Sequence, residues 1–143
     1  MQELIDEIGP HNNADLRGQY AGPLATYVVC TILGFPEDSH DEIYRWYEDF
    51  ALALSNFEGA YEHNERAQMS VNKFRALGTE LLERFAREPN ASLLSALAND
   101  ESHALSTDEI LANALIILFG GIETTDAFIA NALWVLLSHP HQL

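Results

Sequence analysis

The sequence is poor in basic residues and has a single cysteine, and both scarcities exclude whole classes of protein. Its 143 residues include 7 Lys and Arg against 22 Asp and Glu, for a formal net charge of −15. No basic stripe is available to neutralise phosphates, so we expect neither a nucleic acid nor an anionic membrane as a partner. Cys30 cannot close an internal disulfide or build a cysteine-rich zinc site, which favours a reducing, intracellular setting.

The sequence also lacks a signal for export or membrane insertion. Residues 1–10 carry acids where a signal peptide has a basic region followed by an apolar one. The longest apolar segment, residues 110–122, is shorter than the ~20 residues of a membrane span and contains two glycines. We therefore expect a soluble cytoplasmic protein.

Several common site motifs are missing as well. There is no Gly-x-Ser-x-Gly elbow and no glycine-rich phosphate loop. The six histidines include no i, i+4 pair and no pair of Glu-x-x-His motifs, and a proline turn at a helix end explains His139-Pro140-His141. We therefore predict no metal site made by this chain's own side chains.

The spacing of hydrophobic residues, together with residues that cap or end helices, predicts a mainly α-helical chain. Helices are expected over residues 1–8, from Gly22-Pro23 to Gly34, from a capping box at 39–42, over about 62–87, over 92–99, and for roughly 30 residues from a capping box at 106–109. Residues 11–20 are expected to form a polar loop with one short extended piece near Leu16. An aromatic group follows the capping box at 39–42 and is either core or part of a ligand pocket; it comprises Tyr44, Trp46, Tyr47, Phe50 and Phe57.

The last predicted helix carries an apolar face that continues in register through the polar stretch "GGIETT", residues 120–125. That face comprises Leu111, Leu115, Leu118, Ile122, Thr125, Ile129, Leu133 and Leu136. Two glycines inside a helix cost about 1 kcal/mol each relative to alanine, so a compensating benefit is expected: close packing of another helix, a cap at Thr124 or Thr125 that restarts the helix, or a function. Thr124 can donate to the carbonyl of Gly120 and open the helix locally for a water or a diatomic ligand. The glycines leave a flat notch, and Glu123 can pass a proton.

This pattern, Gly-Gly-x-Glu-Thr-Thr in a long apolar helix, resembles the oxygen-binding motif of the cytochrome P450 family of haem-thiolate monooxygenases. Residues 15–50, with an apolar helix ending in Leu-Gly-x-Pro, and residues 105–143 also resemble that family, and the soluble bacterial members match best. The resemblance implies a partial P450 fold, with residues 1–143 forming a single incomplete domain from the middle of such a protein.

The resemblance also implies roles for individual residues. Thr124 would be the alcohol that stabilises bound dioxygen, and Glu123 would be the acid of the proton path. The haem-binding residues would be Gly120, Gly121, Ile116, Ile117 and Thr124, and the substrate pocket would include Phe119, Ile117 and Gly120. Thr125 receives no separate role. The implied cofactor is haem, and the implied partners are dioxygen, a small organic substrate and an external electron donor of the ferredoxin or flavoprotein type.

Parts of the family's site have no counterpart in this sequence. The haem-ligating cysteine loop and the Glu-x-x-Arg helix are missing, and Cys30 lies in an apolar helix matched to a segment far from the iron. We therefore expect an internal fragment that is inactive by itself and exposes apolar surface on its last helix. The alternative is a non-catalytic helical module that binds a ligand or a partner, with Gly120-Gly121 as a helix-crossing point.

Overall fold

The computed structural model describes residues 2–8, 14–102 and 105–142, and every element in these ranges is helical. The α-helices are α1 (Gln2–Ile8), α2 (Gly22–Leu33), α3 (His40–Leu54), α4 (Tyr61–Arg87), α5 (Leu93–Ala98) and α6 (Thr107–Ser138). Three short turns accompany them: the π-helical η1 (Arg17–Ala21) and the 3-10 turns η2 (Glu37–Ser39) and η3 (Pro140–Gln142). The predicted mainly α class is confirmed.

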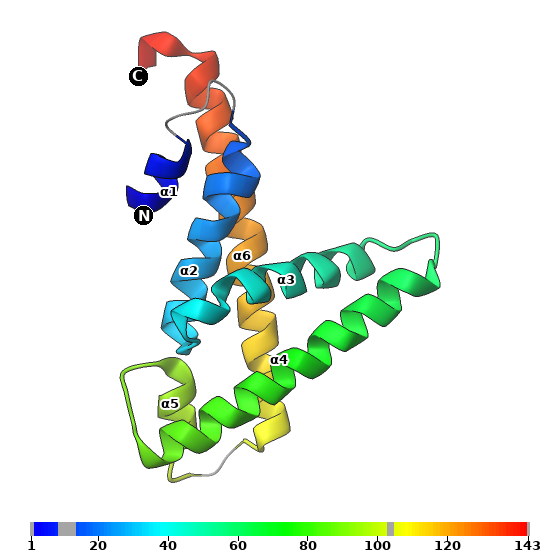
Figure 1. Ribbon diagram of the computed structural model, residues 1–143, viewed down its shortest axis with the longest axis vertical. Helices are drawn as coiled ribbons and strands as arrows, with labels where there is room; N and C mark the ends of the chain where they lie inside the picture. Colours follow the sequence, from blue (N-terminus) through cyan, green and yellow to red (C-terminus); the bar gives the residue numbers. More distant parts are fainter. Residues whose placement is uncertain (1, 9–13, 103–104, 143) are drawn as a thin grey trace.

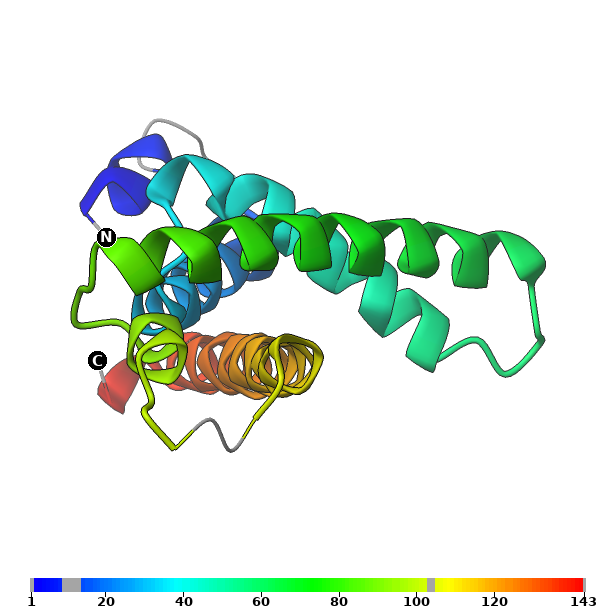
Figure 2. The ribbon, with the colours of Figure 1, turned by 90° about the horizontal axis from the view of Figure 1, so that it is seen from below.

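The helices form an upright pair with an arm at its side. α6 runs the length of the molecule, and α2 lies against its C-terminal half in the opposite direction (Figure 1). α3 leaves the end of α2, crosses α6 and projects outward, and α4 returns from the tip of this arm toward α5 (Figure 1). In the view along α6, the arm extends well to one side of the upright pair (Figure 2). The middle of α6 is therefore the place where α2 and α3 both make contact.

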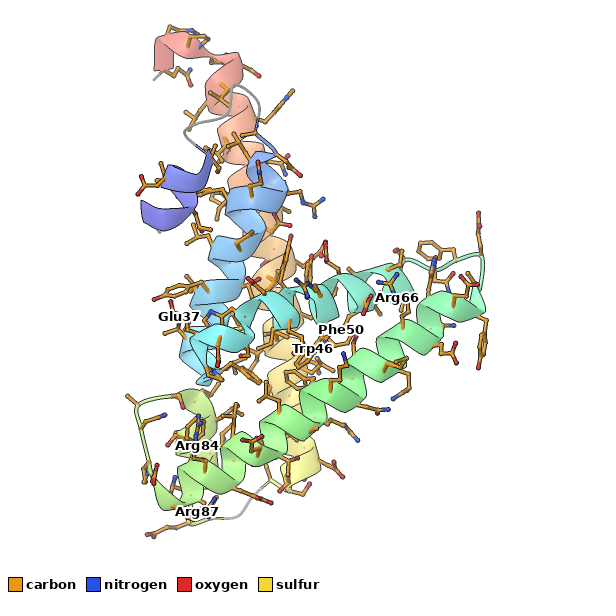
Figure 3. All side chains as sticks on the ribbon, in the orientation of Figure 1. Glu37, Trp46, Phe50, Arg66, Arg84 and Arg87 are labelled. Carbon is orange, nitrogen blue, oxygen red and sulfur yellow. The ribbon has the colours of Figure 1, made fainter. Side chains whose placement is uncertain are left out.

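The arm is held together by aromatic packing and a charged cluster. Trp46 and Phe50 are buried on α3, in the angle between α3 and α4 (Figure 3). Asp49 accepts hydrogen bonds from Arg66 at 2.5 Å and from Ser70 at 2.7 Å, both on α4. An apolar stripe of α4 faces the core, with Phe74, Leu81 and Phe85 buried and Val71 and Leu77 partly buried.

The start of α2 differs from the expectation. Instead of a loop with an extended piece near Leu16, the chain forms the π-helical turn η1 and runs directly into α2, which begins at Gly22 with Pro23 in its first turn. The predicted end is confirmed, because Gly34 has φ 98° and its N–H donates to the carbonyl of Cys30 at 2.8 Å. Such a left-handed conformation favours glycine.

One of the two predicted capping boxes forms and the other does not. Ser106 and Glu109 bond each other's backbone N–H groups at the start of α6, and the Ser106 bonds hold the pKa of the Glu109 carboxyl below its usual range. The prediction for Ser39 was wrong. Its hydroxyl donates to the carbonyl of Pro36 at 2.6 Å, because the chain already turns in η2 before α3 begins.

We expect Ser106→Ala to lower the free energy of unfolding by about 1 kcal/mol, the usual cost of losing an N-cap. Ser39→Ala, the matched control, should cost clearly less, since Ser39 makes no capping bond to α3. The Glu109 contribution is present at neutral pH and should disappear as the pH falls through the lowered pKa of Glu109. Urea unfolding of both variants at pH 7 and at acidic pH measures this, and equal losses would contradict the assignment.

α6 is a single α-helix of 32 residues that continues through the two glycines, as predicted. Its buried positions are Ile110, Leu111, Ala114, Leu118, Ile122 and Asp126. Of the face predicted from sequence, Thr125 and Leu136 are instead exposed. The expected exposed apolar surface is present, mainly at Phe128, Trp134, Val135, Leu136 and Leu137.

By length and composition alone, α6 could cross a membrane, which corrects the sequence argument that no segment is long enough. The glycines and threonines do not end the helix, so its apolar stretch is longer than residues 110–122. The core helix of a soluble protein passes the same test. Glu123 and Asp126, near the middle of α6, have hydrogen-bond partners on α3 and η1, as a core helix requires.

Candidate functional site

An exposed strip along α6 gathers the predicted cofactor-binding residues. Ile116 is 70% exposed, and Ile117, Gly120 and Thr124 are exposed as well. Their spacing of three and four residues places them on one side of the helix. We call Ile116, Ile117, Gly120 and Thr124 the open face. It is apolar at one end and has a hydroxyl at the other.

The two glycines have different surroundings. A Cβ atom added to Gly120 would meet nothing within 4 Å. A Cβ added to Gly121 would lie 2.9 Å from Cγ2 of Val29, a buried residue of α2. Gly121 therefore permits the close approach of α2 to α6, and only Gly120 offers bare backbone to the open face. That Gly121 also lines a cofactor surface stays a prediction.

Thr124 makes the predicted hydrogen bond, since its hydroxyl donates to the Gly120 carbonyl at 2.6 Å. The expected local opening of the helix does not accompany it, because α6 remains α-helical on both sides. A threonine can bond to the carbonyl four residues earlier without breaking the helix. The hydroxyl thus sits on the open face, beside the Gly120 backbone. Thr125 is exposed too.

Glu123 points away from the open face, toward α3. Its carboxylate accepts a hydrogen bond from the hydroxyl of Tyr47, which lies 76 residues earlier in the chain. Burial, together with this bond to Glu123, raises the pKa of Tyr47, so the phenol stays protonated and donates. The Phe119 ring packs against Tyr47 with 5.6 Å between centroids. Phe119 and Glu123 are therefore part of the contact between α3 and α6.

The aromatic group of α3 divides between core and surface. Trp46, Tyr47 and Phe50 are buried, and Tyr44 stacks on Tyr47 with 5.8 Å between centroids. Phe57, beyond the end of α3, is 95% exposed. The core interpretation therefore holds for the residues on α3 and fails for Phe57.

Sequence reasoning missed a second charged contact one turn further along α6. Asp126 is 1% exposed, and its Oδ2 accepts from Nε of Arg17 in η1 at 2.9 Å. Its Oδ1 is buried and has no hydrogen-bond partner among the described residues. The signal available in the sequence was an acid three residues after Glu123 in an otherwise apolar helix. Its partner, 109 residues away, could not be read from spacing.

The remaining candidates do not form a site. Cys30 is fully buried in α2, and burial raises the pKa of its thiol to about 12. No group of three or more His, Cys, Asp or Glu suited to a metal ion occurs among the described residues. His139 and His141 contact each other edge to face beyond the end of α6, whereas His11 and His103 lie outside the described residues.

Comparison with known proteins gives a consistent result. No family model matches the sequence. The 6-deoxyerythronolide B hydroxylase of Saccharopolyspora erythraea is 34% identical over 99% of this chain, which covers 34% of that relative. The mycinamicin IV hydroxylase/epoxidase of Micromonospora griseorubida is 33% identical over 96% of this chain, again covering 34% of the relative. A solved mutant of the mixed-function P450 MycG, in complex with mycinamicin V, matches 98% of this chain and 35% of its own, with 31% identity and a TM-score of 0.82. Over nearly its whole length, the chain is therefore similar to one segment of cytochrome P450 proteins.

The chain spans about a third of the length of the curated relatives it matches. P450BioI, solved in complex with hexadec-9Z-enoic acid ligated acyl carrier protein, matches 99% of this chain and 36% of its own at 25% identity and a TM-score of 0.83. The helices α1 to α6 are therefore a partial P450 fold, as the resemblance implied.

The open face fits the haem that the P450 family implies. A flat apolar ring needs a shallow surface, and Gly120 provides one where a Cβ atom would otherwise project. Ile116 and Ile117 supply exposed apolar contact beside it. The Thr124 hydroxyl lies at the same surface, next to Gly120. Cys30 does not fit the axial ligand, because its thiol is buried within the helix core and protonated.

Proposed function

We propose that this chain forms the distal side of the haem pocket in a monooxygenase that uses dioxygen to hydroxylate a small organic substrate. The observation that carries the proposal is the open face of α6, where bare backbone at Gly120 adjoins a threonine hydroxyl. Relatives named as hydroxylases share this segment. We place residues 1–143 in one domain that is incomplete by itself.

Each open-face residue has a distinct part in the proposal. Ile116, Ile117 and Gly120 would hold one face of the haem, which supplies the iron for oxygen activation when bound. Ile117 and Gly120 would also border the substrate. Phe119 was predicted to join them, but its ring packs against Tyr47 at the α3 contact, so it would reach the substrate only from that side of α6. Thr124 would offer its hydroxyl to the oxygen atoms. The 2.6 Å bond to the Gly120 carbonyl supports this role, because it fixes the orientation of that hydroxyl.

Glu123 would supply the proton for a relay through the Thr124 hydroxyl. In that relay the hydroxyl would turn its own proton, which now bonds to the Gly120 carbonyl, toward the oxygen atoms and would take the proton of Glu123 in its place. Its carboxylate and the Thr124 side chain are on adjacent residues of α6, and adjacent helical residues point about 100° apart. Glu123 must therefore leave Tyr47 and rotate before it can reach the Thr124 side. The hydrogen bond from Tyr47 supports a resting position in which Glu123 is held at the α3 contact.

The proposal includes an external electron donor of the ferredoxin or flavoprotein type, and a cytoplasmic location without nucleic acid or membrane as partners. The net charge of −15 supports the absence of nucleic acid and of anionic membranes among the partners. The relatives act on 6-deoxyerythronolide B and mycinamicin IV by name, which supports a small organic substrate.

The 143-residue chain, supplied with haem and reduced under carbon monoxide, is expected to show no Soret band of the thiolate type. Cys30 is its single cysteine, and a buried thiol with a pKa of about 12 is not a thiolate at neutral pH. The measurement is a difference spectrum of the unaltered chain and of Cys30→Ala, which should agree. A thiolate-type band that disappears in Cys30→Ala would show that Cys30 is an axial ligand.

A non-catalytic helical module remains the second candidate, because Gly121 does lie at a helix crossing. It predicts that the Thr124 hydroxyl and the Glu123 carboxylate can be removed without functional effect. The haem-pocket proposal predicts the opposite, so the same variants separate the two.

A further inference from the structure

A buried carboxylate oxygen on α6 lacks a donor. Asp126 is 1% exposed, and Arg17 satisfies its Oδ2 but not its Oδ1. Leaving a buried acceptor unsatisfied is unfavourable, so a donor is expected to bind there. Asp126 lines a cavity of about 510 Å³, which is roomy enough for water molecules. Oδ1 itself has almost no accessible surface, so a water reaches it once the carboxylate turns slightly toward the cavity.

The same cavity reaches Glu123. Its lining includes Arg17, Tyr47, Glu48, Glu123 and Asp126, which come from η1, α3 and α6. Glu123 and Asp126 are three residues apart on α6, which places their Cβ atoms about 5–6 Å from each other. Tyr47 bonds the Glu123 carboxylate at this cavity. A water on Oδ1 of Asp126 would thus lie within one or two hydrogen bonds of Glu123.

The charges around the cavity favour the approach of protons over anions. Carboxylates line it at Asp15, Glu48, Glu123 and Asp126, and the single cation in that lining is Arg17. Arg17 forms an ion pair with Asp126, and its side chain is 59% exposed, so it does not close the cavity to solvent. Asp15, Glu48 and Ser55 are also exposed to solvent at this cavity.

We propose that Asp126 and this cavity form the port through which protons from bulk water reach Glu123. Asp126 acts as a positioning residue: its Oδ1 holds an ordered water, which gives a proton to the Glu123 carboxylate and takes another from solvent. No oxidant or other co-reactant is consumed. The inference rests on the proposed function, because it assigns a supply route to the proton that Glu123 delivers.

The first test uses the unaltered protein that carries this chain. A high-resolution crystal structure should show an ordered water within hydrogen-bond distance of Asp126 Oδ1, inside the cavity. A hydrogen bond to Oδ1 from a protein donor in place of the water would overturn the proposal, as would a cavity without ordered water. This measurement needs neither turnover nor a variant.

The second test compares Asp126→Asn with Asp41→Asn in the haem-loaded protein. Asp126→Asn keeps the shape of the side chain but removes its charge, and we expect kcat to fall on the order of tenfold with KM for substrate unchanged. The solvent deuterium isotope effect on kcat should rise. Asp41 is an exposed acid at the start of α3, outside the cavity lining, so its variant should behave as the unaltered protein.

The outcomes separate the port from the proposed function. If Glu123→Gln slows turnover but Asp126→Asn leaves kcat and the isotope effect unchanged, the port is wrong and the proposed function stands. If Glu123→Gln leaves turnover unchanged as well, the proposed function itself fails. Haem content and thermal unfolding of each variant show whether a loss reflects folding, in which case the crystallographic water decides.

Discussion

Replacing Thr124 by alanine is expected to reduce the product formed per dioxygen consumed on the order of tenfold, because a positioned proton-transfer group is lost. The hydroxyl is fixed by its 2.6 Å bond to the Gly120 carbonyl, on the face where a Cβ at residue 120 would meet nothing. Without it, oxygen consumption should continue while its electrons are diverted from product. Measuring oxygen uptake and product together in the haem-loaded protein that carries this chain gives the ratio directly.

Thr125 provides a matched control for this experiment. It is also exposed, it is next in the chain, and Thr125→Ala removes the same atoms and gains the same few tenths of a kcal/mol in helix propensity. We expect its product yield per dioxygen to match that of the unaltered protein. Thr124→Ser, which keeps a hydroxyl, should restore most of the yield. If Thr124→Ala and Thr125→Ala cannot be distinguished, the helical-module alternative gains the support that the haem-pocket proposal loses.

Local sequence signals predicted the features of α6 that depend on neighbouring residues. Ser106 and Glu109 are three residues apart, so their reciprocal capping could be predicted from the sequence and is confirmed. The bond from Thr124 to Gly120 spans one helical turn and was predicted for the same reason. Ser39 shows where such reasoning fails, since its hydroxyl donates to the nearby carbonyl of Pro36 and does not cap α3.

The contacts that sequence reasoning missed join residues far apart in the chain. Tyr47 reaches Glu123 across 76 residues, and Arg17 reaches Asp126 across 109. Neither pair has a spacing that a helix or turn would impose, so a single sequence contains no sign of the partner. The missing information was the arrangement in which α3 crosses the middle of α6 while η1 and α2 pack alongside it (Figure 1). That crossing turns Glu123 toward α3 and leaves Thr124 on the open face.

The packing of α2 against α6 also distinguishes the two adjacent glycines, because Gly121 faces Val29 of α2 and Gly120 lies on the open face. Gly121→Ala is expected to lower the free energy of unfolding by about 1–2 kcal/mol, because its Cβ would press on Val29 in a packed interface. Val29 is β-branched and buried, so it has little freedom to move aside. Gly120→Ala should instead raise that free energy by up to about 1 kcal/mol through helix propensity alone. Urea unfolding of the two variants without haem measures both.

Two further variants test the reasons for these opposite signs. Combining Gly121→Ala with Val29→Ala should cost less than the sum of the single changes, because the second change removes the atom that the new Cβ meets. Gly120→Leu should retain stability yet weaken haem binding, since its side chain would project over the surface that Gly120 leaves bare. A loss of stability in Gly120→Ala would show that Gly120 is packed in the intact protein. Undiminished haem binding in Gly120→Leu would place the cofactor elsewhere, because a leucine side chain and a haem cannot occupy the same surface of α6.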